Sequence, residues 1–107
     1  MVLTVQEARK RHGAKIHEGA KIHAGAIIHP SAVIHSGAEV WNDAVIETGV
    51  VVHSNAKVCV GAWIQQNAVI GEGATIRYGV VVGKSARVAD YAIVEPNTVV
   101  VVEPDSN

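Results

Sequence analysis

Six histidines are the residues of this sequence best suited to chemistry, and four of them follow an isoleucine at intervals of six residues. An imidazole ring titrates near neutral pH, so it can act as a general base or as a metal ligand. Five histidines share one position of a six-residue repeat: His17, His23, His29, His35 and His53. Their chemistry therefore depends on a fold that repeats every six residues.

The six-residue repeat, or hexad, starts at Ile16 and continues to Val100 without an insertion. Its first position is Ile or Val in all fifteen hexads, and its fifth position is alanine in eleven of them. The fourth position is mostly glycine, with Asn, Asp and Ser among the exceptions. Because Gly, Asn and Asp tolerate a left-handed backbone, this position predicts a corner. We expect the four residues that follow each corner to form a short strand whose side chains alternate inward and outward.

The outward sixth position indicates how many strands complete one coil. Its side-chain types sort cleanly when residues eighteen apart are compared, and they mix when residues twelve apart are compared. The three resulting series are Ile27, Val45, Trp63, Val81 and Val99; Lys15, Val33, Val51, Val69 and Arg87; and Lys21, Glu39, Lys57, Thr75 and Ile93. The sequence therefore predicts an all-β protein, a parallel β-helix of about five triangular coils.

The pattern (Ile/Val)-x-x-(Gly/Asn)-(Ala/Val)-x, as in "IHEGAK", "IHAGAI" and "VGKSAR", resembles the bacterial hexapeptide-repeat family. The resemblance implies a left-handed parallel β-helix, and the handedness rests on it alone. Known members are mostly homotrimeric acyltransferases that use acyl-CoA or acyl carrier protein. Gamma-class carbonic anhydrases, sugar-nucleotide enzymes and non-catalytic proteins share the scaffold, so the fold does not decide the function.

The chain divides into three segments. These are an N-terminal cap of residues 1–13, a β-helix of residues 14–104 and a tail of residues 105–107. Thr4 and Glu7 have the spacing of a capping box, and Gly13 can end a helix. We expect a short helix or turn over residues 4–12 to cover the first coil, with an irregular strand as the alternative. At the other end, residues 103–105 discourage a further strand from pairing.

Composition excludes several classes of function. The net charge is −1 with scattered charges, which indicates neither a nucleic-acid partner nor an anionic membrane surface. The N-terminus lacks the apolar core of a signal peptide, and no stretch is long enough to span a membrane. The single Cys59 excludes an internal disulfide and a cysteine-cluster zinc site. We therefore expect a cytoplasmic protein without a resident cofactor.

Two adjacent faces of the predicted prism are apolar and one is polar. The valine face carries Val33, Val51 and Val69, the tryptophan face carries Ile27, Val45, Trp63 and Val81, and the polar face carries Lys21, Glu39 and Lys57. Two such apolar faces expose more hydrocarbon than a small monomer usually does. A threefold rotation would lay the valine face of each subunit on the tryptophan face of the next, so we expect a homotrimer. The alternative is that outward valine reflects strand propensity alone.

His17, His35 and His53 lie eighteen residues apart and should stack beside the valine face. In the predicted trimer, His35 and His53 reach the outer rim of the subunit interface, which makes them candidate catalytic residues. The alternative is that this position accepts any polar residue and that the histidines are simply solvated.

Three functions remain open on these residues. No insertion interrupts the repeat to build a pocket, which favours a compact homotrimeric scaffold or binding protein. The first alternative is an acyltransferase that takes acetyl-CoA or another acyl-CoA as its substrate and uses a histidine base at the interface. A more distant alternative is a zinc protein like the gamma-class carbonic anhydrases, which needs converging histidines. His29 should lie near the threefold axis, away from His35 and His53, so no metal site is expected.

Overall fold

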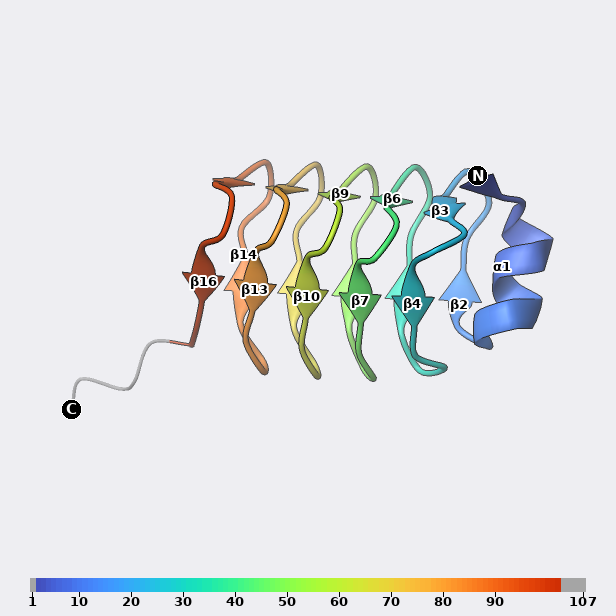
Figure 1. Ribbon diagram of the computed structural model, residues 1–107, viewed down its shortest axis with the longest axis horizontal. Coiled ribbons are helices and arrows are strands. Elements are labelled where there is room, and N and C mark those ends of the chain that lie inside the picture. The colour runs from blue at the N-terminus through green and yellow to red at the C-terminus, as the bar shows by residue number, and fades with distance from the viewer. Residues whose placement is uncertain (1, 103–107) are drawn as a thin grey trace.

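The computed structural model describes residues 2–102 and contains a parallel β-helix of five coils (Figure 1). The all-β fold predicted from the repeat is confirmed. The segment expected to end the β-helix, residues 103–105, and the tail of residues 105–107 lie outside the described residues.

Three sheets form the sides of the prism. The polar face is built from β3 (Lys21–His23), β6 (Glu39–Val40), β9 (Lys57–Val58), β12 (Thr75–Ile76) and β15 (Ile93–Val94). The tryptophan face is built from β4 (Ile27–Ile28), β7 (Val45–Ile46), β10 (Trp63–Ile64), β13 (Val81–Val82) and β16 (Val99–Val100). The valine face is built from β2 (Lys15–Ile16), β5 (Val33–Ile34), β8 (Val51–Val52), β11 (Val69–Ile70) and β14 (Arg87–Val88).

The register of these sheets places every residue opposite the residue eighteen positions away. Val51 pairs with Val33 on one side and with Val69 on the other, and all pairs between β2 and β16 are parallel. The three-sided coil inferred from the outward residues is therefore confirmed.

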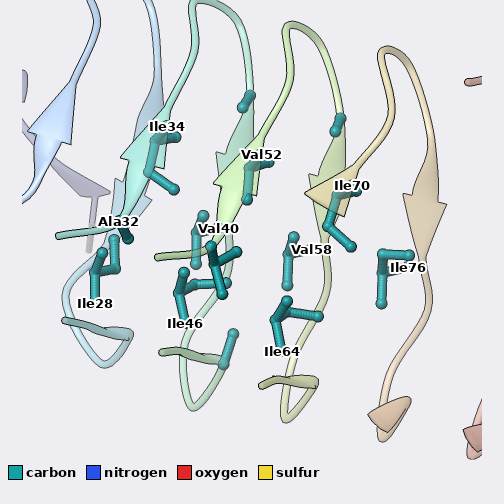
Figure 2. Close-up of a cluster of buried hydrophobic side chains, with 14 of the residues drawn as sticks. Ile28, Ala32, Ile34, Val40, Ile46, Val52, Val58, Ile64, Ile70 and Ile76 are labelled. Carbon is teal, nitrogen blue, oxygen red and sulfur yellow. The ribbon is translucent and has the colours of Figure 1, made fainter. Parts of the chain in front are cut away.

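The core is a set of aliphatic columns inside the prism (Figure 2). First-position side chains from Ile16 to Val88 are at most 6% exposed, and most fifth-position alanines lie beside them without contact to solvent. Ile46, Ile64 and Ile70 are among the side chains that point into this bore in Figure 2. Each buried Ile or Val contributes about 1.5–3 kcal/mol through removal of its surface from water. The bore contains no aromatic ring among the described residues.

The corners follow the fourth position of the hexad, as predicted. Every fourth-position residue from Gly37 to Asn97 has a positive φ, including the non-glycine residues Asp43 and Tyr91. Gly25 and Ser31 do not have one.

Several corners also interlock from one coil to the next. A Cβ atom placed on Gly49 would overlap the carboxamide oxygen of Asn67, which lies one coil further along. The same relation joins Gly37 to Asn55 and Gly79 to Asn97. At Gly61 the nearest atom to such a Cβ is a backbone nitrogen 4.0 Å away. Each of these three glycines therefore leaves room for the asparagine side chain of the next coil, in addition to its left-handed backbone conformation.

The N-terminal end of the prism is covered by a helix and a strand. Helix α1 (Val5–His12) begins with the predicted capping box of Thr4 and Glu7 and ends at Gly13, which has a φ of 68°. The Nε–H of Arg9 donates to the carbonyl oxygen of Ile16 at 2.6 Å, which fastens the helix to the first coil. Strand β1 (Val2–Leu3) pairs antiparallel with β3. The helix expected over residues 4–12 is therefore confirmed, and strand β1 lies before this segment and not in place of the helix.

Replacement of Ile64 by Trp should overpack the bore. Ile64 is fully buried, and extra volume in a packed core costs about 1–3 kcal/mol of unfolding free energy. Thr75→Trp is the control, because Thr75 occupies an outward strand position and should change the stability by less than about 0.5 kcal/mol. Urea melts of the two variants measure the difference, and equal losses would contradict the assignment of inner and outer positions.

Replacement of Gly49 and of Gly61 by alanine should distinguish the cost of a left-handed backbone from the cost of a clash with the next coil. Gly49 and Gly61 have nearly the same φ, 73° and 72°. Gly61→Ala should lose about 1–2 kcal/mol for a left-handed residue that carries a Cβ. Gly49→Ala should lose more, because the new methyl group must also displace the side chain of Asn67. Thermal melts that show the same loss at both sites would rule out a role for the asparagine.

Candidate functional site

Three histidines form a column at the corner between the valine face and the polar face. Each follows a strand of the valine face, and the backbone N–H groups of His17, His35 and His53 donate to carbonyl oxygens of the next coil at 2.9 Å. The rings of His17 and His35 stack with centroids 4.8 Å apart, and those of His35 and His53 stack at 5.2 Å. The ring planes differ by 12° and 3°. The structure therefore brings the two candidate catalytic residues together, in what we call the histidine column.

His35 is the central and half-buried ring of the histidine column. Partial burial lowers its pKa below the ordinary value of 6.5, and the positive charges that His17, His53 and Lys15 can carry lower it further. All these effects disfavour the imidazolium form. His35 is therefore neutral at pH 7 and can accept a proton, as a general base must.

The column ends at Gly71, which occupies the position above His53 in the next coil. A Cβ on Gly71 would lie 2.6 Å from both the backbone nitrogen and the carboxylate oxygen Oδ1 of Asp90, so the backbone and the acidic side chain of the next coil take the space that a side chain there would fill. This oxygen accepts a hydrogen bond of 2.9 Å from the backbone N–H of Glu72. The hydroxyl of Tyr91 donates to Glu72 Oε1 at 2.6 Å.

Sequence reasoning missed this acidic end of the column. The glycine at a position otherwise held by histidine was the available signal, since it marks a close approach of backbone or side chain. The pKa of the Tyr91 hydroxyl is raised, chiefly by its hydrogen bond to Glu72 and by the negative charge of that carboxylate. Tyr91 consequently stays protonated and continues to donate this hydrogen bond.

A second group of rings lies at the corner between the polar face and the tryptophan face. His23 stacks on Trp41 with ring centroids 4.1 Å apart, and Val60 and Tyr78 are exposed at the same corner further along.

Burial raises the pKa of the Cys59 thiol, and the nearby charges of Arg77 and Lys57 only partly offset this. The thiol is therefore protonated at pH 7 and unsuited to act as a nucleophile.

The side chains expected at a subunit interface point outward on both apolar faces. Ile27 and Trp63 are 54% and 44% exposed. The remaining five are half-buried by their neighbours in the sheet: Val33, Val45, Val51, Val69 and Val81. The indole N–H of Trp63 donates to a carboxylate oxygen of Glu47, which fixes the ring on the tryptophan face.

No group of three or more His, Cys, Asp or Glu side chains among residues 2–102 is arranged to hold a metal ion. His29 is exposed at a different corner from His35 and His53, as expected. The described part of the chain also has no helix long and apolar enough to cross a membrane.

Comparison with known proteins bears on the repeat and on the fold. Residues 13–48 match the family model described as bacterial transferase hexapeptide, six repeats. A search of curated proteins found no match.

Solved structures that are similar to the chain include the following three. A candidate acetyltransferase of Bacillus cereus is 16% identical with a TM-score of 0.51, over 81% of this chain and 68% of that one. The acetyltransferase domain of PglB from Neisseria gonorrhoeae is 18% identical with a TM-score of 0.45, over 86% of this chain and 53% of that one. A hexapeptide transferase family protein of Anaplasma phagocytophilum is 15% identical with a TM-score of 0.37, over 81% and 69%.

At these identities the similarity to solved structures extends to the fold and not to an activity. The chain spans about half of the Neisseria domain. The matched residues 13–48 cover six hexads, and the same hexad continues in register to Val100. The family model thus matches the first part of the repeat, and the β-helix that the uninterrupted hexads form confirms the resemblance to the bacterial hexapeptide-repeat family.

Proposed function

We propose that the protein is a homotrimeric acyltransferase whose active site lies at the outer rim of each subunit interface. The observation that carries this proposal is the stacked pair His35 and His53, in which the pKa of His35 is lowered so that the imidazole is neutral at pH 7. The matched family is one of transferases, and the Bacillus cereus structural neighbour is named as a candidate acetyltransferase.

The trimer is argued from the order of faces and corners. Each strand of the valine face runs from the corner shared with the tryptophan face, near Ser31, to the corner that carries His35. If the shared corner points to the threefold axis, the histidine column lies at the far edge of the interface. The tryptophan face of the neighbouring subunit then closes the groove from the other side. Trp63 and the stacked Trp41 are the large side chains available to wall it.

The proposed reaction uses the imidazole as a base. Neutral His35 takes the proton of an acceptor hydroxyl or amine, and the acceptor oxygen or nitrogen attacks the thioester carbonyl carbon of acetyl-CoA. The carbon–sulfur bond breaks as the new ester or amide bond is completed. The CoA thiolate leaves and recovers a proton from the imidazolium, so the reaction ends with neutral histidine and free CoA. Acetyl-CoA enters this scheme as a substrate.

A second candidate function is a binding or structural scaffold. The specific observation in its favour is the unbroken hexad between Ile16 and Val100, which leaves no inserted loop between these residues to bind an acceptor. In this case the apolar faces serve assembly, and the histidine column has no substrate.

Val51→Glu should convert the trimer into monomers. Val51 lies at the centre of the valine face, and a carboxylate buried there without a partner costs several kcal/mol at each of three related contacts. Thr75→Glu on the polar face is the matched control and should leave the mass unchanged. Sedimentation velocity measures the mass of each protein, and a monomeric parent protein would contradict the trimer.

Removal of the proposed base should slow thioester consumption. His35→Ala should lower turnover of acetyl-CoA by about 10²–10⁴-fold, the usual contribution of general base catalysis. His29→Ala is the control, because His29 is exposed at another corner. Release of free CoA is followed with a thiol reagent in the presence of amine and hydroxyl acceptors, and binding of acetyl-CoA is measured by calorimetry. If the parent protein neither binds nor consumes acetyl-CoA, the scaffold function is supported instead.

A further inference from the structure

The geometry of the histidine column restricts how it can respond to protons. The three rings are nearly parallel, and their centroids are separated by 4.8 and 5.2 Å. Their backbones are fixed in the hydrogen-bond ladder of the valine face, where each N–H donates at 2.9 Å to the next coil. The coils therefore cannot move apart to separate charges on neighbouring rings. Only rotation of the side chains away from the stack can do so.

We propose that the histidine column is an acid-sensitive element of the β-helix, which stays stacked while one imidazole is charged and is disrupted when neighbouring rings are both protonated. The proposal concerns a single chain. It requires neither acetyl-CoA nor contact between subunits, and so it goes beyond the proposed acyl transfer.

Repulsion between neighbouring rings is large enough to matter. Two unit charges about 5 Å apart in a partly buried setting weaken the binding of the second proton by about tenfold or more. His35 has a neighbour on each side, whereas His17 and His53 each have one. Protonation of the central ring therefore meets repulsion from both sides.

Charged groups of both signs lie around the column. Lys15 of β2 adds a positive charge. The carboxylate of Glu18, next to His17, forms an ion pair with Arg9 of helix α1 at 3.6 Å. Above the column, Asp90 accepts a hydrogen bond from the backbone of Glu72, and the carboxylate of Glu72 accepts one from Tyr91. Asp90 and Glu72 keep their negative charge while they accept these hydrogen bonds, but they lie at the Gly71 end of the column, beyond His53, and not beside the central ring of His35.

The direction of the pH dependence follows from these positions. The folded chain holds the pKa of His35 below its ordinary value of 6.5. The unfolded chain, in which the rings are separate and solvated, therefore binds more protons as the pH falls. At pH 7.5, well above 6.5, the His35 ring is largely neutral in both states, and this source of instability is nearly absent. Stability should decline as the pH falls below that value.

The experiment compares urea unfolding at pH 7.5 and pH 5.0 in three proteins: the parent chain, His35→Gln and His29→Gln. Glutamine replaces the central ring by a neutral polar side chain, and His29 is an exposed histidine outside the column. In the parent chain and in His29→Gln, the folding equilibrium constant should fall by about tenfold more between the two pH values than in His35→Gln. Each protein is compared with itself, so a general loss of stability in His35→Gln does not affect the result.

Titration of the histidine rings by NMR provides an independent readout. In the parent chain the pKa of the His35 ring should lie below its ordinary value of 6.5. Equal acid sensitivity of all three proteins, or independent titration of the three rings in the parent chain, would overturn the proposal.

Discussion

In-register stacking at a spacing of eighteen residues is the constraint on which the rest of this structure depends. Because the short strands are held by backbone hydrogen bonds to the neighbouring coils, no strand can slip by one residue without moving its side chains to the wrong face. The bore accepts only small and aliphatic side chains, and these form columns of similar residues. Stability is consequently shared along the whole prism between neighbouring coils and is not concentrated in one core.

The same constraint shapes the outer surface, where function must lie. Stacking that is favourable for isoleucine inside the bore also brings like residues together outside it, and an outward histidine that recurs every eighteen residues becomes a column of parallel rings. Partial burial and the neighbouring rings then favour the neutral form of His35. A property useful to a general base and a sensitivity to acid thus have one physical origin.

Sequence reasoning predicted the parts of the molecule that the period determines. The coil of three strands, the buried columns and the stacking of His35 on His53 all follow once residues eighteen apart are placed side by side. It did not predict the asparagine over Gly49 or the placement of Asp90 over Gly71, because these depend on side-chain conformations at individual corners. The N-terminal end was left open between helix and strand for a related reason, since both fit a short segment outside the repeat. The pattern of apolar faces also leads us to propose contacts between subunits, which a single chain does not contain.

A crystal structure of the protein grown with acetyl-CoA tests the central claim most directly. The account predicts three β-helices around a threefold axis, with the thioester in the groove between the histidine column of one subunit and the tryptophan face of the next. The imidazole of His35 should lie within hydrogen-bonding distance of the acceptor position beside the thioester carbonyl carbon. An isolated β-helix, or a trimer that binds acetyl-CoA away from His35 and His53, would contradict it.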